Sequence, residues 1–336
     1  MPLIASRGSG SAQGLGFSVF VSAGGGDGTV GIFQIGTTSS ATSNIRNKYT
    51  YATCTSTATG VAVASAVTAS GAAAGNSTRG IFQIGRSGAS GTTNIRNKYT
   101  YATCTSTACG VASASIVTEG ASAAGNSTRG IFALGQSNTP FPTAVTTRNK
   151  YTYASCTSTA CGVASASNTN RSGAAAGNNT RGIFQLGFAC QSGTFTFSSI
   201  RNKYTYATCT SATATCSGCS YARSSGTGNS TRGIFAMGTA SNNSLTNIRQ
   251  KYTYATDVST SSGVGTASDI STFGSAAGNS TRGIFALGST TSSVQRSSAR
   301  NKFTYSNCTS TACGVGAASA ASDEGAAASW ATCVNS

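Results

Sequence analysis

The chain has 336 residues, of which 42 are glycine and only 8% are charged, and its formal net charge is +16. Globular domains ordinarily carry about 25% charged residues and about 7% glycine. Histidine is absent, and the six acids are Asp27, Glu119, Asp257, Asp269, Asp323 and Glu324. This inventory excludes a histidine-based catalytic triad and a histidine metal site, and it leaves few carboxylate pairs for acid–base catalysis.

The beginning of the chain shows neither a secretory signal nor a membrane span. Its first residues, MPLIASRGSG, lack a basic region followed by an apolar one. No segment approaches the roughly 18 uncharged apolar residues that a spanning helix needs. We therefore expect synthesis in a cytosol without membrane insertion, and we regard residues 1–13 as a possible N-terminal arm.

Two short motifs then alternate along the whole chain. Gly-Ile-Phe begins at positions 31, 80, 130, 182, 233 and 283. Lys-Tyr-Thr-Tyr begins at positions 48, 98, 150, 203 and 251, and the variant Lys-Phe-Thr-Tyr begins at position 302. Six units of about fifty residues fill the chain, and a period of roughly 40–50 residues is typical of a β-propeller.

One unit, residues 70–119, shows the expected blade. A strand of very small residues (70–75) precedes an Asn-Ser-Thr turn, and RGIFQIG (79–85) and NKYTYAT (97–103) alternate as strands do. Residues 104–109 are expected to form a turn, and GVASAS (110–115) a fourth strand. Second strands are predicted near 30–36, 80–85, 130–135, 182–187, 233–238 and 283–288. The small-residue strand should be innermost, because blades converge on the axis.

The sequence therefore predicts an all-β fold, a single six-bladed β-propeller domain (1–336) of four-stranded antiparallel blades. Either residues 14–27 or the tail, 325–336, would supply the strand that closes the ring. The strand order resembles the kelch repeat, although a single glycine ends the second strand and the usual tryptophan is missing. The wording KYTYAT followed by AGNSTRGIF is similar to a kelch-like repeat of tailed-phage virion proteins.

Three cysteine pairs share the form Cys-Thr-Ser-Thr-Ala-Cys: Cys104 and Cys109, Cys156 and Cys161, and Cys308 and Cys313. We expect each pair to bracket the turn between the third and fourth strands and to form a disulfide across a hairpin. The pairing of the other cysteines stays open: Cys54, Cys190, Cys209, Cys216, Cys219 and Cys333. A zinc site at Cys216 and Cys219 would need a second pair of ligands, so we expect no metal and no cofactor.

Positive charge follows the repeat. Seventeen of the 22 basic residues lie in its motifs: the six lysines, the arginines two residues before them (Arg46, Arg96 and equivalents) and those in Thr-Arg-Gly (Arg79 and equivalents). A nucleic-acid binder usually concentrates such charge in one groove, so no nucleic acid is expected. We expect rings of surface arginines that cap strands and bind loop carbonyls, or that meet an acidic protein or an anionic glycan.

The connections differ between the two faces of the predicted ring. Turns after the first and third strands hardly change from blade to blade, whereas loops after the second and fourth strands vary in length and content. Recognition usually uses diverse loops held on a rigid scaffold, although neutral drift would also make loops diverse. Aromatic and amide side chains in these loops are candidates for a ligand-binding surface: Phe141, Phe188, Phe195, Phe197 and Asn138.

The resemblance implies a non-enzymatic virion protein of a tailed phage, in a tail fibre, baseplate or other surface appendage. Its partners would be other virion proteins and a host surface glycan. It would be made in the host cytoplasm and become extracellular after lysis, which reconciles paired cysteines with the missing signal. The alternative is a cellular surface adhesin or lectin. A propeller enzyme fits less well, because copper oxidases of the kelch type need histidine ligands and six-bladed sialidases need Asp-box turns, which are absent.

Overall fold

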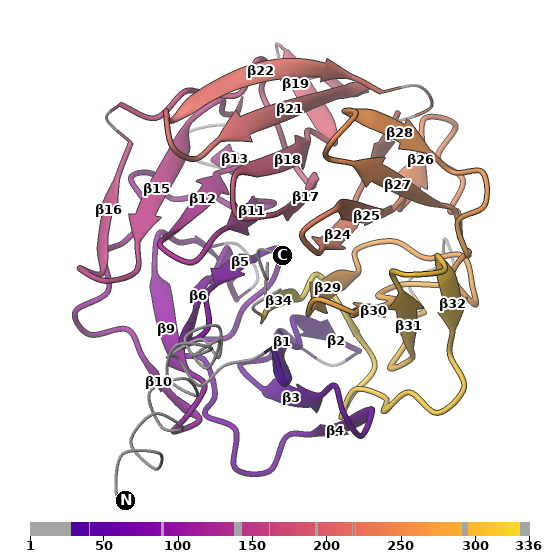
Figure 1. Ribbon diagram of the computed structural model, residues 1–336. Coiled ribbons are helices and arrows are strands. Elements are labelled where there is room, and N and C mark those ends of the chain that lie inside the picture. The colour runs from indigo at the N-terminus through magenta and orange to yellow at the C-terminus, as the bar shows by residue number, and fades with distance from the viewer. Residues whose placement is uncertain are drawn as a thin grey trace, which may run out of the picture.

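Six four-stranded antiparallel sheets follow one another around a central axis in the computed structural model (Figure 1). The structure describes residues 28–39, 41–88, 91–137, 143–160, 162–191, 194–216, 218, 220–290 and 295–329. In order along the chain, the blades are blade 1 (β34-β1-β3-β4), blade 2 (β5-β6-β9-β10), blade 3 (β11-β12-β15-β16), blade 4 (β17-β18-β21-β22), blade 5 (β24-β25-β27-β28) and blade 6 (β29-β30-β31-β32). The predicted six-bladed β-propeller is confirmed.

The innermost strands consist of alanine, glycine, serine and threonine. They are β5 (Ala72–Gly75), β11 (Ser122–Gly125), β17 (Ala174–Gly177), β24 (Ser225–Gly228), β29 (Ser275–Gly278) and β34 (Ala326–Ser329). Only small residues fit there: a Cβ atom added to Gly125 would lie 2.6 Å from Tyr153 Oη and 2.9 Å from the carbonyl oxygen of Arg129. Blade 1 takes its inner strand from far along the chain, because β34 pairs with β1 (Val30–Gln34), with Ile32 opposite Ala328.

The second and third strands carry the core. The second strands are β1, β6 (Arg79–Gln83), β12 (Arg129–Ala133), β18 (Arg181–Gln185), β25 (Arg232–Ala236) and β30 (Arg282–Ala286), where the sequence predicted them. The third strands are β3 (Arg46–Thr50), β9 (Arg96–Thr100), β15 (Arg148–Thr152), β21 (Ile200–Thr205), β27 (Arg249–Thr253) and β31 (Arg300–Thr304). Strand alternation sends isoleucine to one face of each blade and phenylalanine to the other. Thus Ile81 of blade 2 packs against Phe132 and Tyr151 of blade 3.

The predicted fourth strand is wrong. The outer strands are β4 (Thr55–Thr57), β10 (Thr105–Thr107), β16 (Thr157–Thr159), β22 (Thr210–Thr215), β28 (Val258–Thr260) and β32 (Thr309–Thr311), so in blade 2 the outer strand lies inside the segment expected to be a turn. Gly110 adopts a left-handed conformation (φ 67°) and ends this strand region. The segment 110–115 then turns to the next blade, where the Ala112 amide donates to the Cys156 carbonyl oxygen at 3.2 Å.

Short two-stranded sheets decorate one face of the ring. Their strands are β2 (Thr37–Thr38), β7 (Arg86–Ser87), β8 (Gly91–Thr92), β13 (Gln136–Ser137), β14 (Thr143–Ala144), β19 (Phe188–Gln191), β20 (Thr194–Phe197), β23 (Tyr221–Ala222), β26 (Thr239–Ala240) and β33 (Ser322–Asp323). They are built from the loops that follow the second strands and from the residues that precede the inner strands. This face therefore carries most of the variation among blades.

The arginine that opens each third strand is buried between two blades, which corrects the expectation of a surface ring. Arg96 of blade 2 is 1% exposed, and its guanidinium lies 4.4 Å from the centre of the Phe132 ring of blade 3. It donates to Asn149 Oδ1 at 3.2 Å and to Ser158 Oγ at 2.7 Å in blade 3. Equivalent stacks and bonds join every pair of neighbours, including Arg300 of blade 6 to Phe33 and Asn47 of blade 1. We call these six residues the clamp arginines: Arg46, Arg96, Arg148, Arg201, Arg249 and Arg300.

The clamp arginines are buried cations without carboxylate partners among the described residues. Burial lowers the pKa of Arg96 to about 9 and that of Arg46 to about 10. Removing a guanidinium from water is costly, and here aromatic faces and side-chain amides offset that cost. The planar, weakly hydrated guanidinium suits such a site better than an ammonium does.

We predict that Arg96→Leu lowers the free energy of unfolding by about 3 kcal/mol, because it leaves the buried amide oxygens of Gln83 and Asn149 without this donor. Arg96→Lys should recover little of the loss, since it lacks the planar fork. Urea unfolding measures both. Lys98→Gln, on the same strand, is the control and should change the free energy by less than about 0.5 kcal/mol. Equal losses in Arg96→Leu and Lys98→Gln would contradict the clamp.

Candidate functional site

The two faces of the ring are built differently. On the turn face, defined by the Asn-Ser-Thr or Asn-Asn-Thr turns between first and second strands, the same contacts recur. Asn126 Oδ1 accepts the amides of Thr128 and Arg129, both at 3.0 Å, and its Nδ2 donates to the carbonyl oxygen of Asn179 in the next blade. These asparagines are thereby committed to the turns and to the joints between blades. The opposite face, which carries the short sheets, is the loop face.

The second set of repeat arginines also serves the turn face. Arg79 of blade 2 donates to the Tyr153 carbonyl oxygen of blade 3 at 2.9 Å and lies 3.7 Å from Cys156 Sγ. The other arginines of the set also donate to a tyrosine carbonyl oxygen of the next blade (Arg129, Arg181, Arg232 and Arg282). In blade 5 the cysteine position holds Asp257, which pairs with Arg181 at 3.0 Å and with Lys203 at 2.5 Å. These arginines join neighbouring blades.

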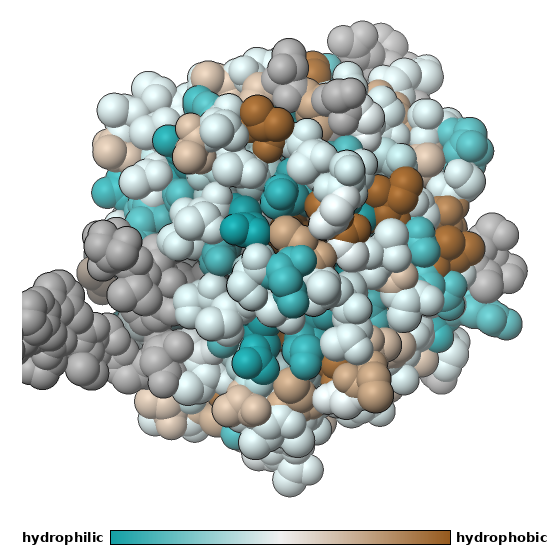
Figure 2. Space-filling view, turned by 45° about the vertical axis from the view of Figure 1, so that its right-hand side comes forward, coloured by the Kyte–Doolittle hydropathy of each residue, from teal (hydrophilic) through white to brown (hydrophobic). Residues whose placement is uncertain are grey.

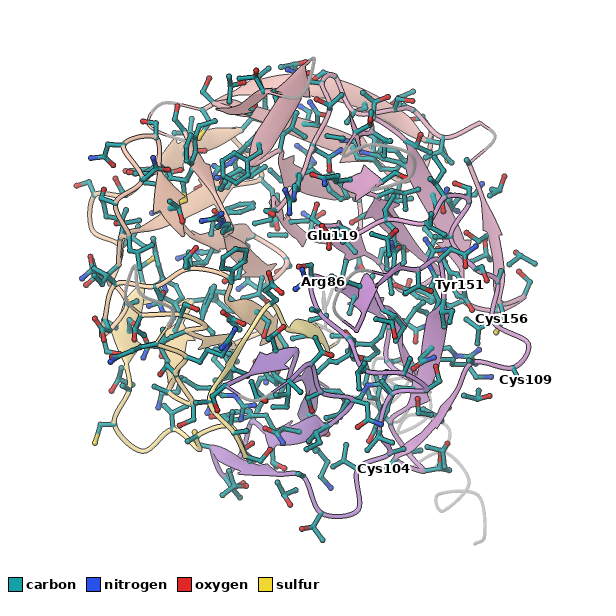
Figure 3. The ribbon with its side chains drawn as sticks, turned by 180° about the vertical axis from the view of Figure 1, so that it is seen from behind. Arg86, Cys104, Cys109, Glu119, Tyr151 and Cys156 are labelled. Atoms are coloured by element: carbon teal, nitrogen blue, oxygen red, sulfur yellow. The ribbon has the colours of Figure 1, made fainter. Side chains whose placement is uncertain are left out.

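The predicted disulfides do not form. Cys104, Cys109, Cys156, Cys308 and Cys313 carry free thiols, and Cys161 lies outside the described residues. The reason is the misplaced strand: β10 separates Cys104 from Cys109, and three strand residues alone span about 10 Å, beyond the Cα separation of a disulfide. Figure 3 shows the two cysteines apart at the rim of the ring.

Six equivalent residues form a closed hydrogen-bonded circle at the loop-face mouth of the central channel. Each stands two positions before the inner strand of its blade, and its amide donates to the carbonyl oxygen of its counterpart in the preceding blade, at 2.6 to 3.0 Å. We call this circle the mouth ring: Ser70, Gly120, Ser172, Arg223, Phe273 and Glu324. No other position ties all six blades together through the backbone alone among the described residues.

The mouth ring has left-handed backbone conformations throughout, with φ between 52° and 67°. Glycine adopts this region freely, whereas other L-residues are destabilised by roughly 1–2 kcal/mol. Only Gly120 is a glycine; a bulky residue such as Phe273 is a marked outlier there. Strained residues cluster at functional sites, so the side chains kept at this ring direct attention to the mouth.

Charges that do not belong to the repeat gather around the mouth ring. Arg86 bridges two acids: its Nη2 lies 2.9 Å from Glu324 Oε2, and its Nε lies 3.9 Å from Glu119 Oε2. Arg171 reaches Glu119 Oε1 at 3.3 Å, so one chain of ion pairs links blades 1 to 4. Figure 3 shows Arg86 and Glu119 beside the centre of the ring, while Cys104, Cys109, Tyr151 and Cys156 lie toward its rim. On the same face Arg296 pairs with Asp323 at 2.9 Å.

Arg223 lies at the mouth without an ion pair among the described residues. Its guanidinium stands 4.6 Å from the centre of the Phe273 ring and 5.6 Å from that of Phe188. Burial, helped by the charge of Arg171, lowers its pKa. A cavity of about 50 Å³ opens beside it, lined by mouth-ring residues and by Ser224. This cavity suits a small polar group and is far below the volume of an ordinary ligand pocket.

The sequence-predicted aromatic candidates are only partly brought together. Phe188 and Phe197 pair across the β19–β20 hairpin with ring centres 4.7 Å apart, and both are half-buried. Phe195 lies on β20, but its side chain is outside the described part of the structure, as are residues Phe141 and Asn138 altogether. The hairpin places Phe188 beside Arg223 and so connects a predicted candidate with the mouth.

Sequence reasoning missed the mouth itself. The signal was present: in an otherwise uniform repeat, the residue two positions before each inner strand reads Ser, Gly, Ser, Arg, Phe and Glu. Four of the five basic residues outside the repeat motifs are described, and all four lie on the loop face: Arg86, Arg171, Arg223 and Arg296.

Comparisons with known proteins add no identity. Neither a protein-family model nor a curated protein matches this chain. Across the described ranges, no group of three or more cysteine, aspartate or glutamate side chains is arranged to hold a metal ion. In the same part of the chain, no helix has the length and apolar character required to cross a membrane.

We predict that Ser172→Gly raises the free energy of unfolding by about 0.5–1 kcal/mol, because glycine relieves the left-handed strain of the mouth ring. Chemical denaturation measures the change. The matched control is Ser230→Gly in an exposed turn with ordinary φ, where added chain entropy should lower stability. Destabilisation of both variants by the same amount would show that the ring stores no strain.

Proposed function

We propose that the chain is a non-enzymatic structural protein of a tailed-phage virion, placed in a tail fibre, baseplate or other surface appendage, and that its loop face contacts the host envelope. The observation that supports this proposal most is where the six blades differ: the residues that depart from the sixfold repeat lie at the mouth and on the loop face. A rigid ring that presents diverse loops is a common arrangement for recognition. The repeat wording, similar to that of phage virion proteins, supports the setting.

The turn face supports a different role within the same proposal. Its turns offer nearly the same backbone shape around the ring, which suits docking to other virion proteins better than recognition of an irregular receptor. Figure 2 shows a surface that is mostly weakly hydrophilic, with strongly hydrophobic residues in a few places, several of them on the right-hand side of the view. On the turn face, Ser, Thr and Asn groups would be the main contacts in docking.

The location follows from the same setting. The protein would be made in the host cytoplasm, assemble into the particle and become extracellular after lysis. The repeat cysteines carry free thiols and so give no support to an oxidising destination, whereas Cys216 is disulfide-bonded.

A cellular surface adhesin or lectin is the second candidate, because the Phe188–Phe197 pair lies among hydroxyl-rich loops as sugar-binding aromatics often do. The position of the gene separates the two: neighbouring phage structural genes favour the virion protein, and neighbouring surface-export genes favour the adhesin.

The function is tested by detecting the protein in purified particles and by competition. Purified protein, added to host cells before the phage, should reduce adsorption, and the double variant Phe188→Ala/Phe197→Ala should need about tenfold more protein for the same reduction, because the aromatic pair is lost. Ser127→Lys, on the exposed turn face, is the control and should compete as the unaltered protein does. Presence in the particle without any competition would restrict the role to assembly, and absence from the particle would refute it.

A further inference from the structure

The mouth of the central channel holds an arginine that has no ion pair of its own among the described residues. Around it, Arg86 and Arg171 are paired with Glu119 and Glu324, whereas Arg223 makes no ion pair among the described residues. Its guanidinium is half-buried, and the charges of both Arg171 and Glu324 act on it. Glu324 also lines the cavity, but its carboxylate is paired with Arg86. Arg223 therefore leaves the mouth with one positive charge in excess. A stacked guanidinium keeps its N–H edge available, and that edge matches the two oxygens of a carboxylate. The arrangement favours a bound anion.

The cavity next to Arg223 contains a buried hydroxyl group that has no hydrogen-bond partner among the described residues. Ser224, 8% exposed, lines it, and its Oγ is buried without a hydrogen bond in the described structure. The hydroxyl-bearing Ser70 and Ser172 lie on the same wall. A buried hydroxyl left unpaired is unfavourable by roughly 1–3 kcal/mol. A ligand oxygen would satisfy it.

The size of the mouth limits what enters it. About 50 Å³ accommodates a carboxylate or a similar oxyanion group but no whole sugar or side chain. The remainder of the ligand would lie outside, over Phe273 and the neighbouring Phe188. Aromatic faces of this kind pack against the C–H face of a pyranose ring, whereas an inorganic ion gains nothing from them.

We propose that the mouth of the loop face binds the carboxylate of an acidic saccharide, with Arg223 as the anion-binding residue, Ser224 as a hydroxyl partner and Phe273 as the platform for the sugar ring. This inference rests on the proposed contact with a host-envelope glycan and names its chemical class. The binding is non-covalent and weakens with salt, because its specificity comes from one ion pair that is only partly buried.

The test is titration calorimetry of the full chain with trigalacturonate, with its methyl ester as a neutral ligand of the same shape. Trigalacturonate should bind, and the ester should bind at least about tenfold more weakly. Arg223→Gln should weaken trigalacturonate binding by about tenfold or more, and Arg223→Lys should fall between the two, because it keeps the charge and loses the fork. Lys98→Gln, which removes the same charge from β9 away from the mouth, should bind as the unaltered protein does.

Several results would overturn the proposal: equal binding of acid and ester, unchanged binding by Arg223→Gln, tighter binding of a glutamate-rich peptide of equal charge, or complete displacement of trigalacturonate by an equal concentration of sulfate. Circular dichroism checks that each variant is folded. If Arg223→Gln is unstable, the trigalacturonate affinity of Arg223→Lys tests the role of Arg223 instead. Saccharide binding through Arg223 by a protein absent from virions would refute the virion function alone. Competition for adsorption that Arg223→Gln retains in full would refute the saccharide site alone.

Discussion

A buried arginine at each joint is the interaction on which the ring depends. Blades meet face to face, and the clamp arginine of one blade lies over the phenylalanine of the next while it bonds to that blade's asparagine or glutamine and serine. Because the guanidinium has no carboxylate partner, its position is set by planar stacking and by fixed amide oxygens. The same set of contacts between blade 6 and blade 1 gives the last joint the geometry of the others. Six equal joints thereby hold the inner strands at one radius.

That regularity explains why the mouth can vary. The backbone circle at the loop face is held by six amides and six carbonyl groups, so the circle itself does not depend on which side chains occupy it. Glycine would fit the left-handed conformation best, yet Arg223, Phe273 and Glu324 occupy it. A position where the backbone is fixed and the side chain is strained, charged or aromatic is where a ligand contact would be selected.

Much of the fold follows from short-range pattern. The alternation in Arg-Gly-Ile-Phe and the tiny residues before it predicted the second and inner strands, because strand periodicity and radius leave few other choices. The sequence did not predict the outer strand, because Thr-Ser-Thr between two cysteines is also typical of a turn. The chain in fact reverses before this segment, at residues 101–104 in blade 2. The clamp arginines were placed at the surface because buried cations without acids are rare; only the neighbouring blade reveals their aromatic partners.

The pairing of β34 with β1 makes completion of the ring a late folding event. The two strands lie roughly 300 residues apart, and joining them in a wholly unfolded chain would cost about 5 kcal/mol in loop-closure entropy, which earlier formation of the intervening blades reduces. During synthesis, blades 2 to 6 can form in succession, each against its predecessor, while β1 keeps an unpaired edge until residues 326–329 emerge. An open strand edge readily pairs with another chain. A partly folded chain with this edge open would therefore be more exposed to aggregation than the finished propeller, and pairing of the final strand would remove the exposed edge.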